Sequence, residues 1–369
     1  MIPKAGGKLR RLGIATIGDR VVQAACKLVL EPILEADFQP CSYGFRPGRR
    51  AQDAIEEIRY LAARSYEWVL EADITACFDE LSHVGIMDRL RQRIADRRVL
   101  ALVKAFLKAG ILGEDGAWRE TTTGAPQGGI LSPLLSNLAL SVLDEHAARA
   151  WQAMGTTSQR HDRRQRGEAT WRLVRYADDF VVMVAGTRAH AEALTDEVAA
   201  VLATMGLRLS EAKTSIRHID EGVCFLGWRI QRHQQRGSQR RYVYTYPSKK
   251  ALAAVKAAVR TLTTTMRNQP LTALLHRLNW VLRGWTTYFR HGSSSATFDY
   301  LRAFTWRRVV GWLRRKHPRI SWKELRRRYC DGTWWPRAGR IVLFNPGSVV
   351  TTRYRPRGTT IPSPWPSAN

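Results

Sequence analysis

The chain of 369 residues is long enough for two or three domains, and its 44% of hydrophobic residues is enough to build cores. Its formal charge of +27 indicates a polyanionic partner. No uncharged apolar run approaches the roughly 18 residues of a membrane helix, and no signal peptide opens the chain, so we expect neither a membrane-spanning nor a secreted protein.

The positive charge is concentrated in one part of the chain. Residues 222–369 contain 29 of the 59 Lys and Arg residues but only three of the 32 Asp and Glu residues. Residues 1–221 keep 30 basic and 29 acidic residues and are almost neutral. We therefore expect the polyanion to bind the C-terminal part.

The five cysteines are an odd number and show no C-x-x-C spacing. They predict neither a zinc site nor a disulfide partner. A reducing, cytoplasmic compartment is the natural inference.

A basic hairpin and two helices are predicted at the start of the chain. Short strand candidates within residues 2–14 flank a Gly-Gly turn and include Lys4 and Arg10, whose cations could clamp a triphosphate. A solvated basic turn explains the same residues equally well. Asp19 predicts the N-cap of the first helix, and a second helix covers about residues 51–64.

A strand pattern over residues 68–73 ends on Asp73, and an acid at the end of a buried strand suits a metal site. Phe78, five residues further on, could wall off a substrate sugar. An ordinary core position is about as good an interpretation. Helical periodicity then covers roughly residues 83–108.

A loop rich in Gly and Pro occupies residues 121–133 and leads into an apolar helix over 134–151. Gln127 and Gly128 lie in this loop, where backbone amides at a helix start can receive a nucleotide or a template backbone. One loop of this kind is weak support. The polar residues 152–170 are interpreted as an exposed insertion.

Residues 173–184 predict a β-hairpin with Asp178 and Asp179 at its tip, because both flanks are β-branched or aromatic. A lone Asp-Asp pair is most often a simple turn. The acidic strand end at Asp73 shifts the balance, because Mg²⁺ prefers carboxylates from separate elements, with substrate phosphates completing its shell. Two such ions roughly 3.5–4 Å apart, with Mn²⁺ as a substitute, are the general arrangement for in-line phosphoryl transfer.

The chain becomes helical and basic after the segments that contain Lys213 and Phe225-Leu226-Gly227. Helices are predicted at about residues 248–266, 271–290, 297–316 and 321–329. Six aromatic residues at helical spacing are interpreted as core more readily than as base-stacking platforms: Trp280, Trp285, Tyr288, Phe289, Trp306 and Trp312. The basic, Pro-rich end of the chain is irregular, with short strands around 341–344.

The motifs follow one order: the basic hairpin, Asp73 with Phe78, Gly-Ala-Pro-Gln-Gly, Tyr-Ala-Asp-Asp, Leu-Ser-x-x-Lys-Thr and Phe-Leu-Gly-Trp. That order resembles reverse transcriptases, in particular those encoded by group II introns. Residues 42–47, Ser-Tyr-Gly-Phe-Arg-Pro, are similar to an opening block of the family, and residues 278–289 to its maturase domain. The resemblance covers nearly the whole chain, and the ordered set is more specific than any single motif.

The resemblance implies an α+β fold of the right-hand polymerase type, with an antiparallel palm sheet. It divides the chain into partial fingers (1–66), a palm with part of the fingers (67–230), an α-helical thumb or maturase (X) domain (231–330) and a basic C-terminal segment (331–369).

The resemblance also implies residue roles. Asp73, Asp178 and Asp179 would be the catalytic metal ligands. Phe78 would exclude a 2′-OH and so select dNTPs. The triphosphate and the incoming nucleotide would be contacted by Lys4, Arg10, Gln127, Gly128 and Lys213. Phe225, Leu226 and Gly227 would form the primer grip.

The implied activity is RNA-directed DNA polymerisation together with binding of group II intron RNA to assist splicing and retrohoming. The implied partners are the intron RNA, an RNA template with a DNA primer, and dNTPs, with no membrane, in a bacterial cytoplasmic ribonucleoprotein.

Two departures from the family pattern leave an alternative open. Met1 stands directly before Ile-Pro-Lys, where the family has further fingers, and no Cys/His-rich endonuclease module follows the thumb. The alternative is a non-catalytic maturase or RNA chaperone that lost polymerisation through the shortened start. An RNA-dependent RNA polymerase would share the Asp-Asp hairpin, but Phe78 argues against it.

Overall fold

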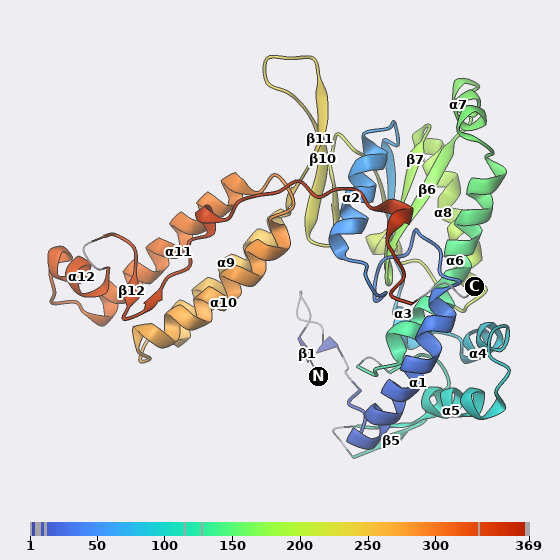
Figure 1. Ribbon diagram of the computed structural model, residues 1–369, viewed down its shortest axis with the longest axis horizontal. Helices are drawn as coiled ribbons and strands as arrows, with labels where there is room; N and C mark the ends of the chain where they lie inside the picture. Colours follow the sequence, from blue (N-terminus) through green and yellow to red (C-terminus); the bar gives the residue numbers. More distant parts are fainter. Residues whose placement is uncertain are drawn as a thin grey trace. The chain divides into compact units, whose positions relative to one another are not determined.

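The computed structural model describes residues 2–3, 9–10, 13–113, 116–126, 128–330 and 333–365, with the backbone alone at 2, 3, 9, 10 and 359. The chain divides into two compact units. Unit 1 is formed by residues 1–221 and 356–369, and unit 2 by residues 222–355 (Figure 1). Among the described residues no helix is long and apolar enough to cross a membrane.

Unit 1 is built around a four-stranded antiparallel sheet, as the α+β interpretation requires. Its strand order is β6-β7-β3-β8. The strands are β6 (Thr170–Tyr176), β7 (Asp179–Ala185), β3 (Trp68–Asp73) and β8 (Ser215–His218). β6 and β7 form the predicted hairpin, and β3 lies antiparallel to β7 on its other side. The two strands that the sequence marked by terminal acids are therefore neighbours.

Helices cover both faces of this sheet. One core combines sheet residues such as Leu70, Leu173 and Val182 with residues of three long helices. Those helices are α1 (Ile17–Glu35), α6 (Ser132–Ala153) and α8 (Arg188–Ala203). The residues that alternate with these along the strands, such as Val69 and Val181, are also fully buried. They face the other side of the sheet, where α2 (Ala51–Ala62) packs against β6 and β7 (Figure 1).

Two helix predictions need correction, and one exposed helix was not predicted. The first helix begins at Ile17, and Thr16 rather than Asp19 is its N-cap, since the Thr16 hydroxyl accepts from the Asp19 amide at 3.1 Å. The helix expected over 83–108 is two helices, α4 (His83–Arg91) and α5 (Arg97–Lys108), because Asp96 caps a new start by accepting from two amides. The polar insertion contains α7 (Thr157–Gln165), which buries no residue and begins at a Thr156 capping box.

Short elements complete unit 1. They are β1 (Ile2–Pro3), β2 (Leu9–Arg10), α3 (Cys77–Glu80), β4 (Ile111–Leu112), β5 (Trp118–Arg119) and the 3₁₀ turns η1 (Glu211–Lys213) and η3 (Gly358–Thr360). β1 and β2 pair antiparallel, as predicted for the opening hairpin.

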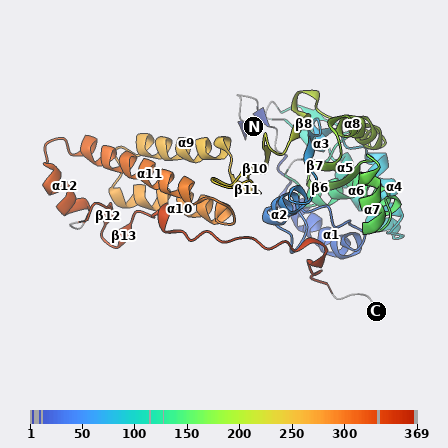
Figure 2. The same ribbon diagram turned by 90° about the horizontal axis from the view of Figure 1, so that it is seen from above.

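Unit 2 joins a three-stranded sheet to helices that pack on one another (Figure 2). The sheet consists of β9 (Val223–Phe225), β10 (Trp228–Gln234) and β11 (Arg241–Pro247). The helices are α9 (Lys249–Thr265), α10 (Leu271–Phe289), α11 (Ser295–Lys316) and α12 (Trp322–Tyr329), followed by β12 (Arg337–Ala338), β13 (Ile341–Val342) and the 3₁₀ turn η2 (Pro346–Ser348). All four predicted helices are present, within three residues at each end.

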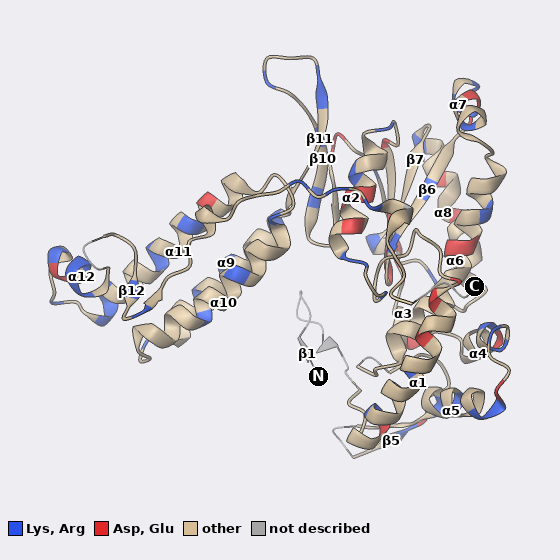
Figure 3. Cartoon of the chain, in the orientation of Figure 1, with Lys and Arg blue, Asp and Glu red and all other residues tan. Residues whose placement is uncertain are grey.

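The aromatic residues of unit 2 divide between core and surface. Trp312 is 2% exposed and belongs to a core with leucines of α10, whereas Trp280 is 65% exposed. The guanidinium of Arg277 lies 5.6 Å from the centre of the Trp280 ring. Lys and Arg recur along α9 to α12 with few acids between them (Figure 3). An aromatic and basic surface is therefore available on this unit.

Candidate active site

The acids singled out in the sequence meet at one end of the central sheet. Asp73 is the last residue of β3, and its Cα partner in the antiparallel register is Asp179, the first residue of β7. Asp178 lies in the two-residue turn before Asp179. Because directly opposed residues project from the same face of a sheet, the carboxylates of Asp73 and Asp179 are neighbours.

The electrostatics show that these carboxylates affect one another. The pKa of Asp179 is raised to about 6, first by loss of hydration and then by the negative charges of Asp178 and Asp73, with Lys213 acting in the opposite direction. The Asp179 side chain still reaches solvent, so its hydration is only partly lost. Asp178 also lies close enough to Cys77 to add to the effect of burial, which raises the pKa of that thiol to about 12.

Lys213 reaches the site from the segment that runs beside the end of β3. The Ser210 amide donates to the Asp73 carbonyl at 2.8 Å, and residue 209 forms a bridge with Ile74. This places Lys213 in η1, where its ammonium forms an ion pair with the Asp73 carboxylate. The Lys213 side chain is 67% exposed, so it is free to move to another anion.

Phe78 lies in α3 directly after the Asp73 strand and is half-buried. The Gly- and Pro-rich loop is fastened to the same short helix, since the Ala125 amide donates to the Phe78 carbonyl at 2.7 Å. Gly124 has φ +86°, and a Cβ there would lie 2.7 Å from the Phe78 oxygen. A glycine is therefore required for the loop to approach the helix this closely.

Gly128 lies close to another segment of the chain, at Gly13. Its φ is +113°, and a Cβ would lie 2.6 Å from the Gly13 carbonyl oxygen. Contact of Gly128 with a nucleotide remains a prediction.

Several predicted site residues are not brought to the acids by the described structure. Lys4 and Gln127 lie outside the described residues, and Arg10 is described only through its backbone in β2. The Phe225-Leu226-Gly227 turn belongs to unit 2. There Phe225 is buried, and the Leu226 carbonyl accepts from the Tyr288 hydroxyl at 2.9 Å.

The sequence analysis missed a buried polar cluster beneath the Asp-Asp turn. Arg175 and Asp144 are both fully buried and form an ion pair. The signal was a basic residue, Arg175, between apolar residues of the strand before the turn, and an acid, Asp144, in the apolar helix over 134–151. Opposite charges in two apolar elements can be buried at low cost only if they pair.

The donor set fits a hard divalent cation by its chemistry. Three carboxylates from two strands and a turn are the oxygen ligands that Mg²⁺ prefers, and substrate phosphates ordinarily supply the rest of its shell. Within the described part of the chain, however, no three His, Cys, Asp or Glu side chains are gathered closely enough to hold a metal by themselves. The pairing of Asp73 with Lys213 is consistent with this, because it engages one of the three carboxylates.

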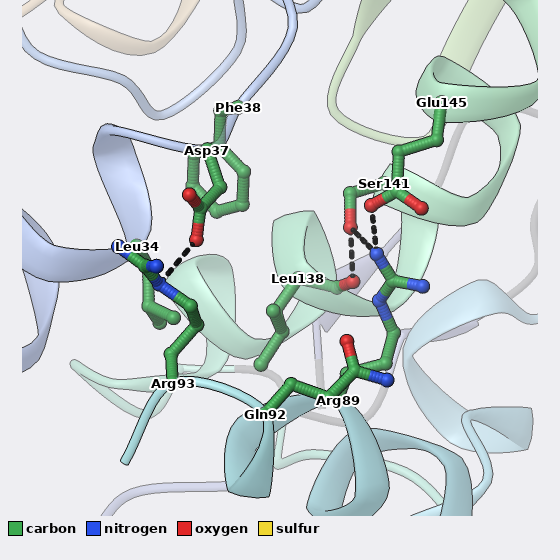
Figure 4. A pocket seen from close by; sticks show the side chains of 9 residues that line it. All are labelled: Leu34, Asp37, Phe38, Arg89, Gln92, Arg93, Leu138, Ser141 and Glu145. Atoms are coloured by element: carbon green, nitrogen blue, oxygen red, sulfur yellow. Dashed lines mark hydrogen bonds and ion pairs between the residues drawn. The ribbon is translucent and has the colours of Figure 1, made fainter. Parts of the chain in front are cut away.

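A pocket of about 230 Å³ lies elsewhere in unit 1, among residues of α1, α4 and α6 and the loops after α1 and α4 (Figure 4). Its charged groups are matched within the pocket, because Arg93 pairs with Asp37 at 2.8 Å and Arg89 pairs with Glu145. None of the three site aspartates lines it. It is therefore separate from the candidate active site.

Comparison with known proteins places the chain in a family. The family model for reverse transcriptase (RNA-dependent DNA polymerase) matches residues 2–230, and the model for the group II intron maturase-specific domain matches residues 252–330. The protein YkfC of Escherichia coli is 39% identical over 269 residues, covering 68% of this chain and 70% of YkfC. The group II intron-encoded protein LtrA of Lactococcus lactis is 30% identical over 274 residues, covering 62% of this chain and 45% of LtrA.

Among solved structures, telomerase from Candida albicans in complex with a fragment of telomeric RNA matches 80% of this chain and 52% of that chain, at 13% identity and a TM-score of 0.45. A likeness at this level does not by itself establish a common fold. The two family models together span most of the chain and establish its family. The chain belongs to the group II intron reverse transcriptase and maturase family.

Proposed function

We propose that this chain is an RNA-directed DNA polymerase that adds dNTPs to the 3′-OH of a primer on an RNA template. The observation that carries the proposal is the register of β3 and β7, which sets Asp73 opposite Asp179 with Asp178 beside them. A cluster of carboxylates has no structural use at an exposed sheet end, because like charges repel. It becomes favourable when cations are bound.

In this proposal the chain's own residues bind and orient the reactants. Asp73, Asp178 and Asp179 would hold two Mg²⁺ or Mn²⁺ ions, which would supply Lewis acidity to the primer hydroxyl and to the phosphates. Lys213 would exchange its partner Asp73 for the pyrophosphate and neutralise the charge on that leaving group. Its exposure and its ion pair with Asp73 at the sheet end support that movement.

Phe78 is proposed to close the sugar pocket against a 2′-OH. Its helix begins four residues after Asp73, and the Gly124–Ala125 loop holds the backbone that carries the ring. Lys4, Arg10, Gln127 and Gly128 remain proposed contacts of the nucleotide, and Phe225, Leu226 and Gly227 remain the proposed primer grip.

Unit 2 is proposed to bind template–primer and group II intron RNA, and through the intron to assist splicing and retrohoming. Its support is the excess of basic residues after residue 222, the exposed Trp280 with Arg277, and the match to the maturase-specific domain. Phosphate contacts by many Lys and Arg residues release counterions, so binding will weaken steeply with salt.

The second candidate is a maturase that binds intron RNA without polymerising. One observation favours it: Lys213 engages the Asp73 carboxylate, and among the described residues no three acidic, His or Cys side chains lie close enough to hold a metal by themselves.

Primer extension on an RNA template with dNTPs and Mg²⁺ separates the two. The unmutated chain is compared with Asp178→Asn and with Asp88→Asn, which removes one acid from the exposed surface of α4. Extension that is lost only in Asp178→Asn supports the polymerase. Tight RNA binding without extension by any of the three supports the maturase.

A further inference from the structure

The guanidinium of Arg175 is fully buried next to the Asp-Asp turn, and all five of its N–H donors are used. Nε and Nη2 donate to the two Asp144 carboxylate oxygens at 2.7 and 2.5 Å. Nη1 donates to the Asn137 side-chain oxygen at 3.0 Å and to the Ala177 carbonyl at 2.8 Å, and Nη2 also donates to the Ser42 hydroxyl at 2.8 Å.

The Ala177 carbonyl belongs to the turn itself. Ala177 has φ +57°, a left-handed conformation that is unfavourable for a residue with a side chain, so the surrounding structure must hold it. Its peptide joins directly to Asp178. A donor fixed on this carbonyl therefore limits the rotation of the backbone that carries both Asp178 and Asp179.

A second contact holds the turn from the loop before α2. Gly44 packs so closely that a Cβ would lie 2.3 Å from the Ala177 nitrogen. The Gly44 carbonyl accepts from the Asn137 amide at 2.8 Å, and the backbones of residues 41–43 and Arg175 exchange two hydrogen bonds of 2.8 Å. Asn137 therefore links the loop, the guanidinium and α6 in one network.

The network is difficult to explain by stability alone. Removing two charges from water costs about as much as their attraction returns, and a well-packed apolar pair of similar volume is often as stable. An Arg at this site does what an apolar residue cannot, which is to donate to the turn and to its two supporting elements at once.

We propose that Arg175, held by Asp144 and Asn137, is a positioning residue that fixes the Ala177 carbonyl and thereby sets the geometry of Asp178 and Asp179 for cation binding. This rests on the proposed metal-dependent function. Arg175 touches neither substrate nor cation. It acts through the backbone of the turn, in the way that outer residues orient the ligands of a metal site.

The test replaces both partners together, Arg175→Met with Asp144→Leu, so that no uncompensated charge is left buried. The matched control is Arg89→Met with Glu145→Leu. That pair joins α4 to α6, and Arg89 donates to Ser141 and Glu145 of α6, not to the turn. Binding of Mn²⁺ to each full-length variant is measured by electron paramagnetic resonance, and hydrogen–deuterium exchange is followed over residues 176–180.

We expect Mn²⁺ to bind Arg175→Met/Asp144→Leu roughly tenfold or more weakly than the control, because the loss of outer-shell partners typically has that effect. The kcat for dNTP addition should fall more than the KM changes. Exchange at the turn should be faster than in the control. Mn²⁺ affinity and exchange that match the control would overturn the proposal.

Failure of the proposed function is recognised separately. If Mn²⁺ binding to the unmutated chain does not depend on Asp178, shown with Asp178→Asn, the cation site is refuted, and exchange over residues 176–180 alone decides whether Arg175 holds the turn. If the double variant does not fold, Arg175→Lys keeps the charge opposite Asp144 but presents one nitrogen in place of three. The same two measurements then apply, with the same outcomes.

Discussion

Arg357→Ala tests an attachment that lies outside both family matches. The chain leaves unit 1 at residue 221 and returns to it at residue 356. After the return, Arg357 donates from Nε and Nη2 to the two carboxylate oxygens of Asp53 at 2.8 and 2.6 Å, and also to the Gly48 carbonyl at 2.9 Å. Ile361, just beyond, is 9% exposed. The C-terminal segment is therefore built into unit 1.

The cost of the substitution follows from the burial of the two partners. The Asp53 side chain is 1% exposed and the Arg357 side chain 34%. Losing one partner of a buried pair typically costs about 3–5 kcal/mol, and a hydrogen bond to a charged group contributes about 1.5–3 kcal/mol. Arg357 is partly in water, and Asp53 keeps its hydrogen bond from the Arg50 amide at 2.8 Å. We therefore expect the free energy of unfolding to fall by about 2 kcal/mol, within the lower of the two ranges.

The assay is hydrogen–deuterium exchange of α2, whose first turn contains Asp53, together with urea unfolding. Exchange is needed because the two units can unfold separately, so that one overall midpoint would not report on unit 1. Arg355→Ala is the control, since it removes the same charge two residues earlier from an exposed position. Equal protection of α2 in the two variants would refute the reasoning.

Four further predictions concern the site and the basic unit. Without metal, Asp179→Asn should be more stable than the unmutated chain at pH 7, because the pKa of Asp179 in the fold, about 6, lies above its ordinary 3.8. The unmutated chain gains stability from protonated Asp179 below pH 4 and loses it as pH rises through 6. The advantage of the variant, measured as hydrogen–deuterium exchange of the unit 1 sheet in urea, should therefore grow between pH 4 and 6 and level off above 7. Lys213→Met should tighten Mn²⁺ binding by freeing Asp73, yet lower kcat, and unchanged affinity would contradict the pairing. Phe78→Ala should admit rNTPs in primer extension, whereas continued discrimination would place the sugar elsewhere. RNA affinity should fall by about 10³-fold or more between 50 and 200 mM salt if six or more phosphates are contacted, and a shallow slope would count against a basic RNA surface on unit 2.

Local patterns in the sequence determined much of the fold. The content of β-branched and aromatic residues predicted the 173–184 hairpin and the strand that ends at Asp73, and 3.6-residue periodicity predicted the helices of unit 2. The family was also readable from the order of short motifs, which the family models confirm. Each of these signals lies within one element or in the order of elements along the chain.

What only the tertiary structure decided was which distant residues meet. The register that sets Asp73 opposite Asp179, and the ion pair that joins Asp73 to Lys213 across 140 residues, depend on how the strands pair. The same holds for Arg175 with Asp144 and for Arg357 with Asp53, because a charge in a sequence does not show which opposite charge will be buried beside it. Sequence periodicity determines which face of a helix or strand is buried. Which residues of two elements meet is determined by the packing between those elements, because the choice of one partner excludes all the others.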